Sequence, residues 1–352
     1  MTLEELALDL VRTPSVTGSE EEIADKIERL IRSLKSVKDC LRLSNTIVAR
    51  VSSPGAPYTI ALCGHLDTVP GDEVGERAFV EGGRLVGTGS SDMKGGVAIM
   101  LKLLEFPPER FRFNTLFIFY ESEEGPYAQN GLHQLFDGGA IKSEDIDLAF
   151  FLEPTDCVLH VGCMGIVNAS VRFHGVRAHS ARPWHGENAI HKAGEALVRL
   201  SRLKIPPVNV GGLEFQESMS ATMAQGGIAP NIVPDLFEIN INYRFAPSKS
   251  IDEAKRYVED FFKGEGEVVF GNLQPSGSIV NSNPVLKIFR ETVSLPELPK
   301  HAYTDVGLFA EHGIEGVNLG PGHTSQAHKK NEYLELEDLR RCYRIYEDFL
   351  LN

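Results

Sequence analysis

The chain contains 352 residues, of which 42% are hydrophobic and 24% are charged, as in an ordinary globular protein and unlike a disordered one. The formal net charge of −14 disfavours non-specific binding to nucleic acid or to anionic membrane surfaces, so we expect neither as a partner. The length exceeds that of one ordinary hydrophobic core, which predicts two domains.

Targeting and redox signals indicate a cytoplasmic protein. The first residues are acidic and amphipathic and lack the basic start and apolar core of a signal peptide. No stretch of about 18 apolar residues is present, so no membrane-spanning helix is expected. The five cysteines are scattered without a Cys-x-x-Cys pair, which argues against a disulfide framework and suits a reducing compartment.

The first half of the chain alternates helical and strand patterns. Residues 3–12 and the segment after a Ser19–Glu22 capping box show helical periodicity. Apolar runs of strand length follow, with one apolar helix between the second and third of them. The strands are expected near 45–51, 58–63, 115–120 and 148–152, and the helix over 95–104. This alternation favours an α/β fold.

The pattern changes near Gly165. From there to residue 271, the segments read as strand, helix, strand, strand, helix and strand, which is the order of a split βαβ, ferredoxin-like domain. Residues 164–271 are therefore expected to form an inserted domain, and residues 1–163 and 272–352 to form the other domain. The last segment returns to α/β character and closes with a helix from about Glu337.

Acidic residues and histidines follow the expected strands directly. These candidates are His65 with Asp67, Asp92 after a glycine-rich turn, Glu121 with Glu123 and Glu124, Glu153, and, after a Gly-Pro-Gly loop, His328. Carboxyl ends of strands in an open α/β sheet form one edge, where sites lie. So many acids would repel one another there unless a cation neutralised them. Two imidazoles with several carboxylates suit zinc or a similar ion, and the number suffices for two metals that share a carboxylate and promote hydrolysis.

Each candidate also has a structural interpretation. A histidine near a strand end is often only hydrogen-bonded, Asp92 could cap the following helix, and the Glu121–Glu124 segment could be a solvated loop. His323 competes with His328 as a ligand. The glycine-rich turn GTGSSD lacks the third glycine of a dinucleotide-binding fingerprint, so that function is disfavoured. The recurrence of candidates at successive strand ends favours a metal site.

Five motifs in order, GHLDTVP, GTGSSDMKGG, ESEEG, LEPT and AHKKNEY, resemble the di-zinc metallopeptidase family that includes aminoacylase and carboxypeptidase G. This resemblance covers most of the chain. It implies a mixed-sheet, di-zinc exopeptidase-like catalytic domain with an inserted ferredoxin-like lid domain through which two subunits dimerise. It also implies two Zn²⁺ or Co²⁺ ions per subunit.

The resemblance implies a ligand set. One ion would be held by His65 and Glu153, the other by Glu124 and His328, and Asp92 would bridge the two. The resemblance further implies a small-molecule amide substrate such as an N-acyl amino acid.

The resemblance also implies roles for residues that do not bind metal. Asp67 would orient His65, and Glu123 would be the general base that takes a proton from the attacking water and later passes it to the leaving amine. His179 would reach the active site of the partner subunit and stabilise the oxyanion. Asn231 and Arg244 would bind a substrate carboxylate. Arg244 could equally form a surface ion pair, and Trp184 is expected to pack in the loop after His179.

Segments of the inserted domain, RAHSARPWHGENAIHKAG and NIVPDLFEININYRFAPS, and the later YTDVGLFA resemble the actinobacterial succinyl-diaminopimelate desuccinylases within this family. This implies cleavage of N-succinyl-LL-2,6-diaminopimelate to succinate and LL-2,6-diaminopimelate, a reaction of lysine biosynthesis. One departure leaves the acyl group open. Related desuccinylases often carry an arginine shortly after Thr-Asp, whereas Thr304-Asp305 is followed here by Val-Gly-Leu.

The sequence also allows other functions. An acetylornithine deacetylase, or another deacylase or peptidase of the family, would carry the same ligand motifs. A non-catalytic, metal-binding regulatory protein is a further hypothesis, and the presence of Glu123 disfavours it because a structural metal site needs no base.

Overall fold

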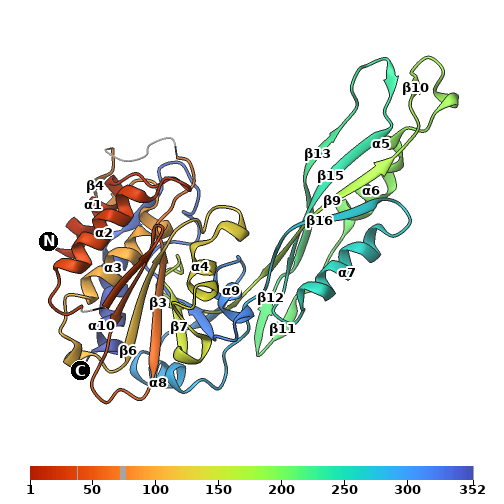
Figure 1. The fold of residues 1–352 in the computed structure, drawn as a ribbon. Helices are drawn as coiled ribbons and strands as arrows, with labels where there is room; N and C mark the ends of the chain where they lie inside the picture. Colours follow the sequence, from red (N-terminus) through yellow and green to blue (C-terminus); the bar gives the residue numbers. More distant parts are fainter. Residues whose placement is uncertain (38, 72–76, 352) are drawn as a thin grey trace. The chain divides into compact units, whose positions relative to one another are not determined.

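The computed structural model describes residues 1–37, 39–71 and 77–351 (Figure 1). Two compact units are present, and each is described by itself. The first unit comprises Met1–Gly162, Val280–Leu298 and Thr304–Asn352, and the second comprises Cys163–Ile279 and Pro299–Tyr303. Within the described ranges, no helix is both long and apolar enough to cross a membrane.

Helices and a large mixed sheet make up the first unit. Its helices are α1 (Leu3–Arg12), α2 (Glu21–Ser33), α3 (Gly95–Leu103), α4 (Gly131–Asp137), α8 (Pro284–Thr292), α9 (Val306–Glu311) and α10 (Leu336–Leu350). The large sheet has the order β1-β2-β6-β3-β7-β18-β8-β17. Its strands are β1 (Asp39–Leu43), β2 (Thr46–Val51), β3 (Thr59–His65), β6 (Asn114–Tyr120), β7 (Leu148–Phe151), β8 (Leu159–Cys163), β17 (Glu297–Lys300) and β18 (Gly316–Asn318). A small sheet joins β4 (Phe79–Glu81), β5 (Arg84–Val86) and β19 (Tyr333–Glu335).

The registers of the central strands explain why their ends coincide. β3 runs parallel to β6 and β7, with His65 opposite Tyr120 and Cys63 opposite Phe151. β2 is antiparallel to β6, so the sheet is mixed. The segments that follow β3, β6 and β7 therefore leave the sheet at one edge, and the predicted α/β fold with a mixed sheet is confirmed.

Adjacent aromatic residues on β7 anchor helices to both faces of the sheet. Successive side chains of a strand point to opposite faces. The Phe150 ring lies 5.4 Å from the Phe349 ring of α10, whereas the Phe151 ring lies 5.0 Å from the Phe309 ring of α9. On the α10 side, α3 is buried along almost its whole length. A side chain at Gly96 would meet the Leu152 carbonyl oxygen at 2.7 Å, so glycine allows α3 to approach the end of β7.

The second unit is a four-stranded antiparallel sheet with helices. Its main strands, in the order β13-β15-β9-β16, are β9 (Gly165–His174), β13 (Ser218–Gly226), β15 (Leu236–Phe245) and β16 (Glu267–Gln274). Its helices are α5 (Ala189–Lys192), α6 (Gly194–Arg202) and α7 (Ile251–Phe262), and its short strands are β10 (Ala178–His179), β11 (Val208–Val210), β12 (Leu213–Phe215) and β14 (Ile232–Val233). The chain order of these elements matches the βαββαβ expectation.

This unit extends beyond the expected range of 164–271. Cys163 and Gly277 exchange two backbone hydrogen bonds, and the Met164 N–H donates to the Ala302 carbonyl. These long-range pairs tie 272–279 and 299–303 to the start of β9, and spacing along the chain could not reveal them.

The prediction of a capping box between Ser19 and Glu22 is wrong. α2 begins at Glu21, and no side chain caps it. The Glu20 carboxylate instead accepts the Gly18 and Ser122 N–H groups, so a tertiary contact with the loop after β6 replaces the local cap.

Candidate active site

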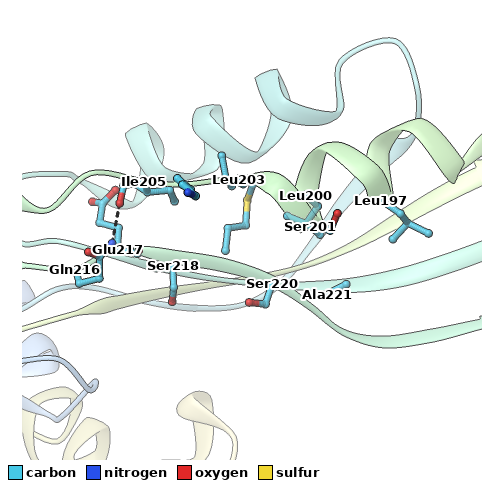
Figure 2. A pocket seen from close by; sticks show the side chains of 12 residues that line it. Leu197, Leu200, Ser201, Leu203, Ile205, Gln216, Glu217, Ser218, Ser220 and Ala221 are labelled. Carbon is cyan, nitrogen blue, oxygen red and sulfur yellow. Dashed lines mark hydrogen bonds between the residues drawn. The ribbon is translucent and has the colours of Figure 1, made fainter.

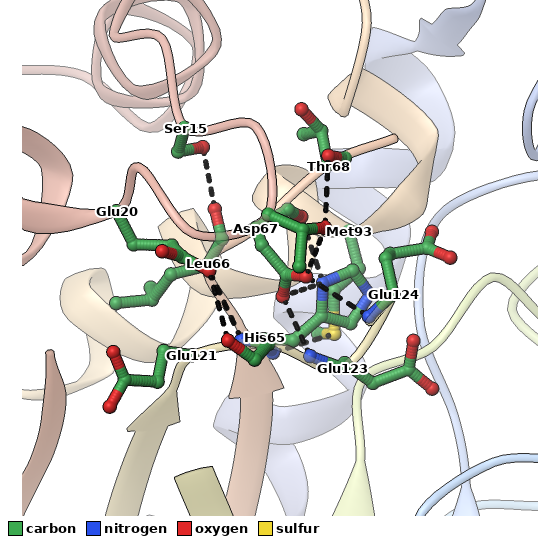
Figure 3. A network of polar contacts seen from close by, with 12 residues as sticks. Ser15, Glu20, His65, Leu66, Asp67, Thr68, Met93, Glu121, Glu123 and Glu124 are labelled. Carbon is green, nitrogen blue, oxygen red and sulfur yellow. Dashed lines mark hydrogen bonds and ion pairs between the residues drawn. The ribbon is translucent and has the colours of Figure 1, made fainter. Parts of the chain in front are cut away.

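His65 is the last residue of β3 and is 1% exposed. Its Nδ1 lies 3.0 Å from the Asp67 carbonyl oxygen and 3.5 Å from Asp67 Oδ1. Its Nε2 faces two other carboxylates, 3.2 Å from Asp92 Oδ1 and 3.9 Å from Glu153 Oε1. The contacts at Nδ1 with Asp67 (Figure 3) therefore direct Nε2 towards Asp92 and Glu153.

The buried Asp67 carboxylate connects three segments. It accepts the Thr17 hydroxyl at 2.8 Å and the backbone N–H groups of Glu123 and Glu124, each at 3.0 Å. Burial alone would raise the pKa of Asp67, but the contacts with His65, Thr17 and the Glu123 N–H lower it below its usual value. An ionised Asp67 thus orients both the imidazole and the loop after β6.

Three groups of side chains offer ligand atoms that lie within 4.8 Å of one another. They are His65, Asp92 and Glu153; Asp92, Glu124 and His328; and His65, Glu123 and Glu124. Asp92 belongs to two groups, as a bridging ligand would. Imidazole nitrogens combined with carboxylate oxygens are a donor set that fits zinc or a similar divalent ion. These side chains therefore fit a two-metal site in chemistry and in spacing.

The structure separates the two candidate histidines near the carboxyl terminus. His328 Nε2 lies 2.7 Å from Glu124 Oε1 and 3.8 Å from Asp92 Oδ2. The hydrogen bond to Glu124 is the main cause that raises the pKa of His328 to about 9. His323 instead lies between Asp156 and Asp338 and belongs to none of the three ligand groups found among the described residues.

The acids after β6 point in different directions (Figure 3). Glu121 accepts the Ser44 hydroxyl at 3.2 Å and the Gln134 amide at 3.1 Å, so it binds the surrounding scaffold. Glu123 lies within the group of His65 and Glu124. Burial raises the pKa of Glu123 well above its usual value; His65 opposes this effect, and neighbouring carboxylates reinforce it. A carboxylate with a raised pKa is suited to hold and release a proton.

His179, Asn231 and Arg244 all belong to the second unit. His179 is exposed on β10, and the neighbouring Ser180 N–H donates to the Asn231 carbonyl at 2.9 Å. Arg244 is half-buried on β15, and its Nε donates to the Asn242 side chain at 3.0 Å.

Arg244 lies far from the other two residues within this unit. It is opposite Ile166 at the start of β9, whereas β10 follows the other end of β9 at His174. The strand between these ends spans roughly 26 Å at about 3.3 Å per residue. Trp184, in the turn after His179, is 73% exposed, so the expectation that it packs in its own loop is wrong.

One residue at the site received no role from the sequence. Glu332 is 3% exposed, and its carboxylate accepts the backbone N–H groups of Gly89, Ser91 and Asp92. Its only sequence signal is its place four residues after His328, within the AHKKNEY motif.

An α/β fold that gathers imidazole and carboxylate ligands at the carboxyl edge of its sheet, beside a carboxylate able to act as a base, defines a metal-dependent hydrolase. Residues 61–352 match Peptidase family M20/M25/M40, and the chain belongs to this family.

Two relatives align with nearly the whole chain. A Mycobacterium tuberculosis protein is 35% identical over 354 residues, which cover 98% of this chain and 97% of that protein. The succinyl-diaminopimelate desuccinylase of Corynebacterium glutamicum is 34% identical over 359 residues, which cover 97% of this chain and 94% of that enzyme. A tripeptidase from Staphylococcus aureus has the same fold, with a TM-score of 0.80 at 22% identity over 99% of this chain and 96% of its own.

Proposed function

We propose that the protein is a homodimeric, metal-dependent amidohydrolase that cleaves N-succinyl-LL-2,6-diaminopimelate to succinate and LL-2,6-diaminopimelate in the cytoplasm. The observation that carries the reaction class is the position of Asp92, which offers a ligand atom within 4.8 Å of those of both the His65–Glu153 and the Glu124–His328 pairs. The similarity to the Corynebacterium glutamicum desuccinylase supports the choice of substrate and its place in lysine biosynthesis.

Two divalent cations, zinc or cobalt, would be held by these five residues, with Asp92 shared between them. Bound there, the cations would polarise the amide carbonyl and make a water molecule nucleophilic at neutral pH. The chain itself contributes the orientation of the ligands. The Asp67 carbonyl oxygen lies 3.0 Å from His65 Nδ1, and the Asp67 carboxylate accepts the backbone N–H of Glu124.

Glu123 would move the proton. One of its carboxylate oxygens takes a proton from the attacking water, and the same side chain then delivers that proton to the nitrogen of the leaving amine. Its backbone N–H is bound by Asp67, so the base and the ligand Glu124 are held by one carboxylate. A metal-binding regulatory protein would need no base held beside its ligands, so this arrangement favours a hydrolase.

The edge of the second unit supports a homodimer. β13 pairs with β15 on one side, and no described strand pairs with its other side. Nearly all of β13 is exposed, and a hollow of about 770 Å³ lies between it and α6, lined in part by Leu197, Leu200 and Leu203 (Figure 2). Exposed edge strands pair readily with another strand. A second copy related by a two-fold axis would pair β13 with β13 and cover this hollow.

The distance between His179 and Arg244 also supports two subunits. Between the position opposite Arg244 and His174, after which β10 follows, β9 is roughly 26 Å long, which favours contributions of the two residues from different copies. We therefore assign His179, with Asn231 beside it, to the oxyanion and the substrate bound by the partner. Arg244 would bind a substrate carboxylate from the other copy, with a guanidinium suited to two parallel hydrogen bonds.

One observation favours a second candidate, a deacylase for N-acetylornithine or a related substrate. Related desuccinylases often have an arginine shortly after Thr-Asp, whereas here Val306 and Leu308 follow Thr304-Asp305 and are fully buried in α9. Asp305, just before this helix, accepts the Asn130 side chain at 2.9 Å. The helix α9 (Val306–Glu311) thus contains no cationic side chain that could bind a succinyl carboxylate.

The test is steady-state hydrolysis by zinc-loaded protein, with N-succinyl-LL-diaminopimelate and N-acetylornithine compared by kcat/KM. The proposal predicts a clear preference for the succinyl compound and loss of turnover after chelation. A preference for N-acetylornithine would replace the substrate and keep the reaction class. No hydrolysis of either compound, or of a panel of N-acyl amino acids and peptides, would overturn the enzymatic function.

A further inference from the structure

We propose that Glu332 is a positioning residue that holds Asp92 in place for both metal positions. The proposal rests on the proposed function in one respect, because it takes Asp92 to be the shared ligand. The Glu332 carboxylate accepts backbone N–H groups of the turn from Gly89 to Asp92, so its role is distinct from that of the metal ligands.

Local structure brings Glu332 to this turn. β19 pairs antiparallel with β5, and Tyr333 lies opposite Val86. Glu332, just before β19, continues this pairing, and its carbonyl oxygen accepts the Gly87 N–H at 2.9 Å. The pairing of β19 with β5 thus places the Glu332 side chain against the turn from Gly89 to Asp92.

The carboxylate satisfies three backbone donors with two oxygens. Oε1 accepts the Ser91 N–H at 2.7 Å and the Asp92 N–H at 2.9 Å, and Oε2 accepts the Gly89 N–H at 2.9 Å. Buried N–H groups need such partners, because water cannot reach them. The turn itself depends on Gly89, whose φ of +83° is unfavourable for other residues.

The same segment carries both a ligand and the residue that holds another ligand. His328 precedes Glu332 by four residues and faces Asp92 Oδ2, while Glu332 binds the Asp92 backbone. Farther along β19, Leu334 is buried and would collide with any side chain at Gly95, the first residue of α3. The segment therefore fixes the turn before Asp92 and the helix after it as one piece.

A glutamine cannot reproduce this arrangement. If its oxygen keeps the Ser91 and Asp92 N–H groups, its NH₂ group faces the Gly89 N–H, and two donors oppose each other. Aspartate keeps two acceptor oxygens but is shorter by one methylene. Glu335 offers a matched control on the same segment, since its carboxylate pairs with Arg84 at 2.7 Å and accepts none of the hydrogen bonds that the described turn from Gly89 to Asp92 donates to Glu332.

The experiment compares Glu332→Gln, Glu332→Asp and Glu335→Gln with the wild type. Metal-free full-length protein is titrated with Co²⁺ in a calorimeter, and circular dichroism verifies folding. Residues that orient metal ligands typically contribute 10- to 100-fold to metal affinity or activity. We expect about this loss of Co²⁺ affinity in Glu332→Gln, partial recovery in Glu332→Asp, and values within about twofold of wild type in Glu335→Gln. In the Co²⁺-saturated enzymes, kcat should fall in the same order with little change in KM.

Wild-type Co²⁺ affinity in a folded Glu332→Gln protein would overturn the proposal, and so would an equal loss in Glu335→Gln. If Glu332→Gln does not fold, Glu332→Asp decides, and unchanged affinity in that variant overturns the proposal as well. A wild type that binds two Co²⁺ ions but cleaves no acyl substrate would contradict the proposed function, while the comparison of Co²⁺ affinities would still judge the role of Glu332.

Discussion

Asp67 Oδ1 accepts the backbone N–H of Glu123 at 3.0 Å, so a residue just beyond β3 fixes the position of the proposed base after β6. Asp67→Asn would place an amide NH₂ group against at least one of the N–H donors now bound. We expect kcat to fall about 10- to 100-fold with metal saturating, as is usual for residues that orient ligands. Thr17→Val, which removes a single hydrogen bond to Asp67, should cost less. Equal losses in the two variants would contradict the explanation.

Glu123→Gln tests the proton transfer. The amide is nearly the same size but cannot take a proton from water, so kcat should fall by about 10²- to 10⁴-fold while metal stoichiometry and KM change little. The matched control is Glu121→Gln in the same loop, whose contacts with Ser44 and Gln134 are structural. That variant should lower thermal stability more than turnover. Wild-type turnover in Glu123→Gln would exclude its role as the base.

The dimer can be tested at the edge strand. Ser220 and Ala221 line the hollow beside α6 and are exposed. Replacing both with lysine places like charges face to face across a two-fold interface, which disfavours edge pairing. Light scattering should then show the monomer mass of 38.8 kDa, and activity should fall because His179 no longer reaches a partner. A monomeric variant with full activity would refute the shared site.

The pKa of Asp156 in the folded protein predicts that the free energy of unfolding depends on pH. Burial raises its pKa, but His323 and the Thr324 N–H and hydroxyl outweigh burial and lower it below the usual 3.8. The folded protein thus holds the proton less tightly than the unfolded chain. The contribution of Asp156 to the free energy of unfolding is therefore fully present above about pH 4, and it is lost as the pH falls through the lowered pKa of Asp156.

The measurement is urea unfolding of wild type and Asp156→Asn at pH 7 and pH 3.5. Because this carboxyl is partly exposed, the difference at pH 7 should be only about 1 kcal/mol, and it should shrink at the lower pH. A difference that is the same at both pH values would show that the ionised form contributes nothing.

Part of this site could be predicted from sequence because parallel strands end together. The apolar runs before His65, Glu121 and Glu153 predict buried strands, and their registers place those ends at one edge. Spacing could not separate Glu121, which binds the scaffold, from Glu123 and Glu124. That separation depends on the backbone contacts made by Asp67, a residue more than fifty positions away.

Other features of the molecule depend on partners distant in sequence. Glu20 lies where a local helix cap would serve, but its carboxylate contacts Ser122. Glu332 lies within the AHKKNEY motif, but only the folded turn brings three N–H groups to its carboxylate. The boundary of the second unit depends in the same way on Cys163 and Gly277, which are far apart in the chain and hydrogen-bonded in the structure.

Trp184 is the single tryptophan of the chain and is 73% exposed, next to the segment that carries His179. Its indole emission therefore comes from one known location and needs no label. A blue shift of this emission at higher protein concentration would show that the turn containing Trp184 becomes buried. Protection from acrylamide quenching when succinate is added would show the same. Natural fluorescence would thus follow the association of the two subunits of the proposed dimer even in a variant without catalytic activity.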